Sequence, residues 1–281
     1  MAHWKTHKNL CSKAEKGVKL MNTKERESMA CKILLLHEQQ DHLEILSHVK
    51  YFEQLLLDGQ LIDHNKVLHA FSFAYHRENT LNPSQANMRG YIKVDARRAS
   101  VLGALQQYEE QGQILVVIAF ACYKSNQPNN SAQCFEKARK SCLGSHSLDI
   151  EVESAIGLGI LSLEKGVASS MGDGTWESGI DILRTAALAS KLISDPLHRR
   201  ELFAMRNLIH YLFRKDDTFQ EGKDALDIYR AMAHEVSTVF NDLTVDELHA
   251  YLLTARMFEV IQPVLCLPSC LYLAIYGCIG T

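Results

Sequence analysis

The segment HEQQDH, residues 37–42, contains the residue types of a helical zinc site. Such a site needs two histidines four residues apart, because this spacing places both imidazoles on one face of a helix. His37 and His42 are five residues apart, so on a continuous helix they diverge by about 140°. Asp41 shares the face of His37, but two ligands do not complete a site. The spacing predicts the polar side of an amphipathic helix, with no metal site and no cofactor.

The segment GVASSMGDG, residues 166–174, has the glycines of a phosphate-binding loop but lacks the G-K-[ST] that follows them in a P-loop. We therefore expect a flexible connection between two helices. The chain also contains no G-x-S-x-G motif and no local cysteine-protease signature. These patterns predict no catalysis, and an all-α enzyme with a site built from scattered residues is the alternative.

The segment ARRASV, residues 96–101, places two arginines before a serine and an apolar residue. It resembles the site favoured by basophilic kinases of the cyclic-nucleotide class, which makes Ser100 a candidate for phosphorylation. A phosphate there would be stabilised at a helix start and disruptive in mid-helix. The alternative interpretation is a solvated charged face near the start of a helix.

Composition favours a globular protein with a reduced interior. Of 281 residues, 47% are hydrophobic and 22% are charged, and the net charge of −3 argues against nucleic-acid binding. The eight cysteines include no C-x-x-C pair, so we expect free thiols and a cytoplasmic protein. Residues 1–27 are basic and lack the apolar core of a signal peptide, which predicts a flexible N-terminal arm.

Helical periodicity extends over residues 28–259, and no useful strand alternation interrupts it. The expected helices cover residues 28–57, 63–77, 95–111 and 244–258, together with three pairs, 114–124 with 130–142, 150–165 with 176–193, and 198–214 with 219–239. Turn residues fill 77–90. The sequence therefore predicts one all-α domain over residues 28–259.

The second helix of each pair repeats a small–large–small pattern. It is carried by Ser131, Phe135 and Ala138, then by Gly179, Leu183 and Ala186, then by Ala225, Tyr229 and Met232. A small residue lets a neighbouring helix approach, and the large one fills the adjacent gap. Over residues 110–240 the pattern resembles the tetratricopeptide repeat. The resemblance implies an antiparallel helix-hairpin array, a TPR-like α-solenoid, and an irregular helical bundle is the alternative.

The resemblance also implies a protein–protein interaction scaffold or adaptor, because the first helices of such repeats line a groove. The partner-binding positions would be Val116, Phe120, Tyr123, Arg206, His210 and Phe213. These positions are mostly apolar, so the expected partner is an apolar peptide or helix of another protein.

The last 22 residues, 260–281, carry no charge. This length suffices to span a bilayer, although Pro263 and Pro268 interrupt it. Three interpretations stay open: an apolar end packed on the domain or a partner, an atypical terminus, or an anchor that makes the protein a membrane-associated adaptor on a cytosol-facing membrane.

Overall fold

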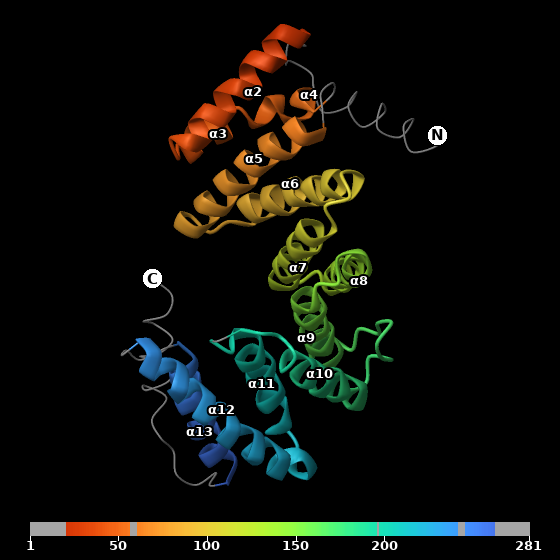
Figure 1. Cartoon of the computed structure of the whole chain (residues 1–281), viewed down its shortest axis with the longest axis vertical. Helices are drawn as coiled ribbons and strands as arrows, with labels where there is room; N and C mark the ends of the chain where they lie inside the picture. Colours follow the sequence, from red (N-terminus) through yellow and green to blue (C-terminus); the bar gives the residue numbers. More distant parts are fainter. Residues whose placement is uncertain (1–20, 57–60, 196, 241–244, 262–281) are drawn as a thin grey trace. The chain divides into compact units, whose positions relative to one another are not determined.

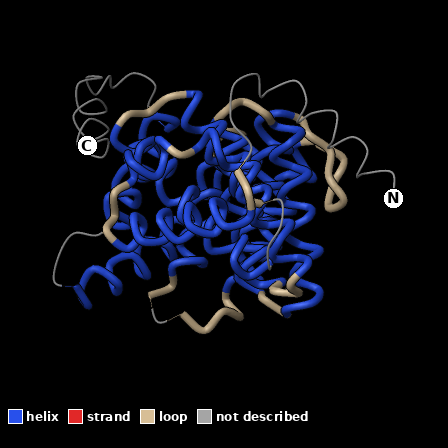
Figure 2. The backbone as a smooth tube through the Cα atoms, turned by 90° about the horizontal axis from the view of Figure 1, so that it is seen from above, coloured by secondary structure: helices blue, strands red, loops and turns tan. Residues whose placement is uncertain are grey.

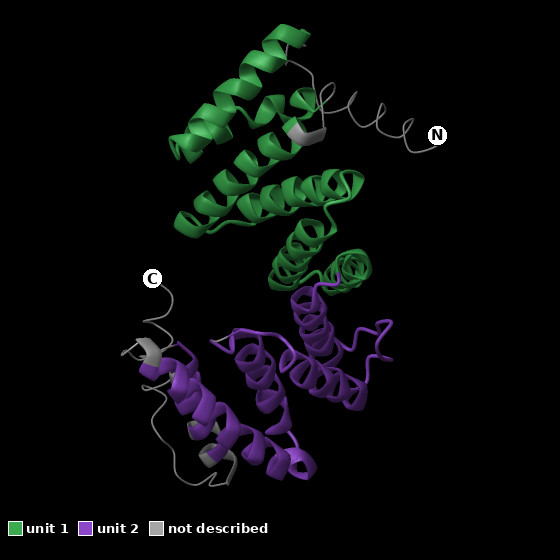
Figure 3. Cartoon of the chain, in the orientation of Figure 1, with its two compact units in different colours: residues 1–145 green, residues 146–281 purple. Residues whose placement is uncertain are grey.

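The computed structural model describes residues 21–56, 61–195, 197–240 and 245–261, and it confirms the all-α prediction (Figures 1 and 2). Within these ranges the chain forms helices and no strand, although an isolated β-bridge joins Ser169 and Gly172. The chain divides into two compact units, residues 1–145 and 146–281 (Figure 3). The bounds expected for the helical domain, residues 28–259, stay a prediction.

The first unit is built from helices that pack mainly on their neighbours in sequence. They are α2 (Thr23–Glu38), α3 (His42–Ser47), the 3₁₀ turn Val49–Tyr51, α4 (Phe52–Leu55), α5 (Leu61–Leu81), α6 (Gln85–Ala104), α7 (Tyr108–Lys124) and α8 (Pro128–Ser145). Helices α2 and α3 pack on α5, and further along the chain α5 packs on α6, α6 on α7 and α7 on α8. Part of the core forms where Phe52 meets Phe71 edge to face, with ring centroids 5.2 Å apart.

The helix expected over residues 28–57 is interrupted twice, between α2 and α3 and again around residues 48–51. It also begins earlier than expected, because Asn22 and Glu25 form a capping box that starts α2 at Thr23. The predicted boundary of the N-terminal arm at residue 27 therefore lies inside a helix. Residues 1–20 lie outside the described residues.

Helix α6 is a larger difference from prediction. The turn expected over residues 77–90 is confined to a few residues around Pro83, and α6 starts at Gln85 rather than at residue 95. The Ser84 hydroxyl caps the helix by accepting a hydrogen bond from Asn87 N at 3.1 Å. Helices α5 and α6 therefore form a hairpin that the sequence pattern did not reveal.

Three connections in the first unit share one turn geometry. After α2, α6 and α7, a residue with a side chain takes the left-handed conformation: Gln40 (φ 58°), Gln106 (φ 58°) and Asn126 (φ 55°). Each donates its N–H to the carbonyl three residues back, and the next N–H reaches the carbonyl five residues back. This is the Schellman motif, usually built with glycine. It ends one helix and starts the next within three residues.

The described part of the second unit is also built from helices. They are α9 (Leu148–Lys165), α10 (Trp176–Ser190), α11 (Arg199–Leu212), the 3₁₀ turn Asp216–Thr218, α12 (Phe219–Phe240) and α13 (Val245–Ile261). Consecutive helices pack on each other, and α11 also packs on α9 and α13. At the α9–α10 crossing, a Cβ added to Gly159 would lie 2.9 Å from Leu183 and 3.3 Å from Gly179 O. Glycine is required by this close approach.

The small–large–small positions of the first two pairs are buried, as that pattern requires. Ser131, Phe135 and Ala138 on α8 and Gly179, Leu183 and Ala186 on α10 all lie in helix contacts. In α12 the large residue Tyr229 is fully buried as the pattern requires, whereas Ala225 and Met232 are only partly buried against the core. Gly222 occupies the close contact there, against Phe213. Membership of the tetratricopeptide family stays a prediction.

None of the helices in the described ranges is long and apolar enough to cross a membrane. The tail prediction concerns residues 260–281, and of these residues 262–281 lie outside the described part of the chain.

The left-handed turns generate a prediction about stability. Gln106→Gly should leave the protein equally stable or stabilise it by up to about 1 kcal/mol, because glycine relieves the left-handed strain of about 1–2 kcal/mol while its greater unfolded-state freedom offsets part of the gain. Gln113→Gly, at an exposed position inside α7, should cost about 1 kcal/mol. Chemical denaturation of both variants measures the difference, and an equal loss in both would contradict the role assigned to the turn.

Candidate functional site

Helix α7 carries three of the predicted partner-binding residues, and the structure separates them. Val116 is buried, with 2% of its surface exposed, so its side chain offers little surface to a partner. Phe120 and Tyr123 are partly exposed. The adjacent Val117, which the sequence interpretation did not select, is 46% exposed. At this turn of α7 the exposed residue is therefore Val117 and not the predicted Val116.

The outward-facing residues of α7 form a continuous surface, which we call the α7 stripe and define as Gln113, Val117, Phe120 and Lys124. Their spacing of three and four residues aligns them along one side of the helix. Phe120 meets the buried ring of Phe135 on α8 edge to face, with centroids 5.0 Å apart. This contact fixes the ring orientation of Phe120 while part of its surface stays accessible.

In the second unit, Arg206 on α11 is engaged by α13. Its Nη1 lies 3.7 Å from Asp246 Oδ1 and 3.4 Å from His249 Nδ1. Asp246 also accepts a hydrogen bond from the Tyr229 hydroxyl at 3.1 Å, and burial raises the pKa of Tyr229. Arg206 therefore joins three helices of the second unit, which is a structural role that does not require a partner protein.

The other two predicted residues, His210 on α11 and Phe213 directly after it, are also in contact with neighbours. His210 meets the ring of Tyr211 edge to face, and its Nε2 lies 3.0 Å from Arg214 Nη2. Phe213 is 3% exposed and packs against Phe219, with ring centroids 5.4 Å apart. Because it is buried, Phe213 offers little side-chain surface for binding.

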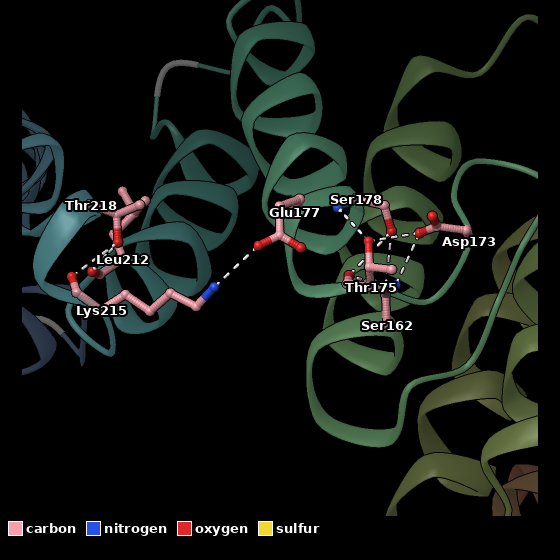
Figure 4. Close-up of polar contacts among 8 residues, drawn as sticks. All are labelled: Ser162, Asp173, Thr175, Glu177, Ser178, Leu212, Lys215 and Thr218. Carbon is pink, nitrogen blue, oxygen red and sulfur yellow. Dashed lines mark hydrogen bonds and ion pairs between the residues drawn. The ribbon is translucent and has the colours of Figure 1, made fainter.

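The connection between α9 and α10, expected to be flexible, is a hydrogen-bonded turn (Figure 4). Asp173 Oδ1 accepts from the backbone N–H of Thr175 at 3.0 Å and from its hydroxyl at 2.7 Å, and these bonds lower the pKa of Asp173. Thr175 Oγ1 in turn caps α10 by accepting from Ser178 N. The Ser162 hydroxyl donates to Thr175 O at 3.0 Å and so ties the turn back to α9.

The first turn of α10 also contacts the end of α11 (Figure 4). Lys215 Nζ lies 3.2 Å from Glu177 Oε1 and 4.8 Å from the ring centroid of Trp176. The Thr218 hydroxyl donates to Leu212 O at 2.7 Å and covers a carbonyl at the end of α11. These contacts hold the second unit together at its surface.

The candidate phosphorylation residue, Ser100, is exposed in the second half of α6. Its hydroxyl donates to Ala96 O at 3.0 Å, one helical turn earlier. Arg98 Nε donates to Asn65 on α5 at 3.1 Å. The expected position near a helix start is wrong, since α6 begins at Gln85. A phosphate at this place would lie toward the negative end of the helix dipole, which disfavours it.

The two histidines of HEQQDH lie on different helices, because α2 ends at Glu38 and α3 begins at His42. The His37 ring packs against His69 and Phe73 of α5, with centroid distances of 5.2 and 5.1 Å. His42 Nε2 lies 3.3 Å from Glu78 Oε2. Across the described residues, no group of three or more His, Cys, Asp and Glu side chains could hold a metal ion.

A buried carboxyl group that the sequence interpretation missed lies between α5 and α6. Asp95 is 3% exposed, and hydrogen bonds connect its side chain to Ser72 and Tyr91. Burial raises the pKa of Asp95, while those bonds and the nearby Arg98 act in the opposite direction. The only sign of this group in the sequence is that Asp95 lies on the apolar face of α6. That position cannot be recognised when the helix is expected to start at residue 95 itself.

A pair of thiols is the second missed feature. Cys122 is buried on α7 and Cys134 is half-buried on α8; the neighbouring Cys134 raises the pKa of Cys122, and Cys122 lowers the pKa of Cys134. Nearby, the buried Ser131 hydroxyl donates to Ala119 O at 2.7 Å and holds the two helices in contact. The cysteines are twelve residues apart, so no C-x-x-C spacing marks them.

Comparison of the chain with models of protein families gives no match, and comparison with curated proteins gives none. Functional inference therefore depends on the chemistry of the residues themselves.

The buried Asp95 predicts a pH dependence of stability. Because its pKa is raised in the folded protein, the folded state keeps a proton that the unfolded chain has already lost. The stability of the wild type relative to Asp95→Asn should therefore fall as the pH rises from the ordinary value of 3.8 toward neutrality. Thermal unfolding of both proteins across this range measures the difference. A relative stability that rises with pH would show that the carboxylate is favoured by its partners.

Proposed function

We propose that the protein is an interaction scaffold that binds an apolar helix or peptide of another protein along the α7 stripe, without catalysis. The observation that supports this most directly is the exposure of Val117 beside the partly exposed ring of Phe120. Phe120 is already held in place by Phe135, so little side-chain entropy is lost when a partner covers it. Ordered aromatic residues of this kind dominate the energy of many interfaces.

The composition of the stripe indicates the chemistry of its partner. Its centre is apolar, with Val117 and Phe120, while Gln113 and Lys124 lie at its ends. An amphipathic helix with apolar side chains three and four residues apart would cover the centre. An acidic residue at one end of that helix would lie near Lys124 and favour one orientation. The partner proposed is therefore an amphipathic segment with an acidic end.

Two further features support a role as a scaffold. Both units are hairpin arrays in which helices contact mainly their sequence neighbours, a construction that offers helix faces for binding. The described cysteines are free thiols, which supports the proposed cytoplasmic location. Arg206, His210 and Phe213 are not part of the proposed surface, because they stabilise the second unit.

Selection of peptides from a displayed random library on the immobilised full-length protein tests the proposal. We expect the enriched peptides to carry apolar residues at helical spacing and an acidic residue near one end. Their affinity for Val117→Glu should be about tenfold lower or worse, since a charge replaces an apolar contact at the centre of the stripe.

Leu143→Glu is the matched control, because Leu143 lies on α8 of the same unit and is 80% exposed. It should bind the enriched peptides with unchanged affinity. Equal binding by both variants, or enrichment of peptides that also bind after Val117→Glu, would show that the stripe is not the binding surface.

A further inference from the structure

We propose that the exposed apolar side of α13 is the docking surface for residues 262–281 of the same chain, the uncharged segment that directly follows this helix. Both the surface and the segment belong to the second unit, residues 146–281. The proposal goes beyond the binding function proposed for α7 of the first unit and does not rest on it.

Helix α13 has an inner side that packs on the unit and an outer side that is apolar and exposed. On the inner side, Ala250 and Leu253 are buried in the core that α11 and α12 also form. On the outer side, Val245 is 56% and Tyr251 60% exposed, and the half-buried Leu248 lies between them. The spacing of three residues places these three side chains along one side of the helix.

Polar residues of α13 are used on its inner side instead. Asp246 and His249 both contact Arg206 of α11, at 3.7 and 3.4 Å, and Asp246 also accepts a hydrogen bond from the Tyr229 hydroxyl of α12. A helix at the edge of a helical array normally turns a polar side to water. Helix α13 instead has the composition of an internal helix, so its outer side needs a covering segment.

Residues 262–281 have the chemistry that this surface requires. They contain no Asp, Glu, Lys or Arg, and apolar residues follow one another closely, as in Val264, Leu265 and Leu267. Such a segment gains free energy when it covers apolar surface, and no charge has to leave water. The described outer side chains of α13 carry no charge either, so a charged partner would find no opposite charge among them.

The position of the segment in the chain favours it over a free partner. Pro263 follows the last residue of α13, Ile261, by two positions, and proline ends a helix and favours a change of direction. From Ile261 back to Tyr251 the helix rises by about 15 Å, a distance that about five extended residues span. Residues after Cys266 are therefore within reach of Tyr251. The tether also gives the segment an effective concentration in about the millimolar range.

Hydrogen exchange of the full-length protein, followed by mass spectrometry, tests the docking. We expect the amides of residues 264–281 to exchange at least about tenfold more slowly than an unstructured chain of the same sequence, because a docked segment is protected from exchange. Exchange at the rate of an unstructured chain would overturn the proposal.

Tyr251→Glu locates the surface. It places a charge on the outer side of α13, so the protection of residues 264–281 should fall by about tenfold or more while the amides of α9 and α10 stay protected. Leu188→Glu is the matched control, because Leu188 lies on α10 of the same unit and is 66% exposed. It should leave the protection of the segment unchanged. Equal protection in the two variants would mean that another surface holds the segment.

A cysteine at the same position gives a second measurement that introduces no charge. The segment contains three cysteines, all in tryptic peptide 257–281, whereas position 251 lies in peptide 231–256, which has none. With oxidised glutathione, Tyr251→Cys should form a disulfide between these two peptides at least about tenfold faster than Leu188→Cys forms one between 185–191 and 257–281. Equal rates would contradict docking on α13.

Two other arrangements would give different results, and each would overturn the proposal. If the segment anchors the protein in a membrane, residues 264–281 become protected only after phosphatidylcholine vesicles are added, and the protein sediments with the vesicles. If the segment covers α13 of a second copy, its protection rises with protein concentration, and the disulfide formed by Tyr251→Cys joins two chains. Docking within one chain predicts protection that is independent of vesicles and of concentration.

Discussion

A left-handed residue at the end of a helix sets the geometry on which the first unit depends. At Gln40, Gln106 and Asn126 the chain reverses within three residues, and the carbonyls at the helix end keep hydrogen-bond partners. A side chain in this conformation costs about 1–2 kcal/mol, so the packing of the helices on either side must hold it. Two of these turns lie at the ends of α7. They fix its rotation, and with it the burial of Val116 and the exposure of Val117.

Close helix approach is the second constraint, and it is met in two ways. Between α9 and α10 the absence of side chains at Gly159 and Gly179 lets the backbones meet. Between α7 and α8 the small Ser131 allows the approach and also donates a hydrogen bond to Ala119 O. A buried hydroxyl that is satisfied in this way adds direction to the contact, since it fixes the register of one helix against the other.

The sequence predicted the fold class and the later hairpins because these depend on periodicity and on small residues at regular spacing. The sequence-based prediction failed where one residue type occurs both inside helices and in turns. Gly90 was interpreted as part of a turn, but it lies inside α6, where a Cβ would meet the ring of Tyr75. Gln40 was interpreted as helical, because glutamine is a good helix former and rarely ends a helix. In both cases a tertiary contact decides between the uses.

The roles of the candidate site residues also depend on tertiary contacts that the sequence pattern does not reveal. Arg206 was expected to face a partner, but Asp246 and His249, far along the chain, contact it instead. The α7 stripe, by contrast, depends on the neighbouring helix alone, since Phe120 is held by Phe135 of α8 while Val117 stays exposed. One position along α7 separates the buried Val116 from the exposed Val117. The face that α7 offers to a partner is therefore recognised only when the contacts of the helix are known.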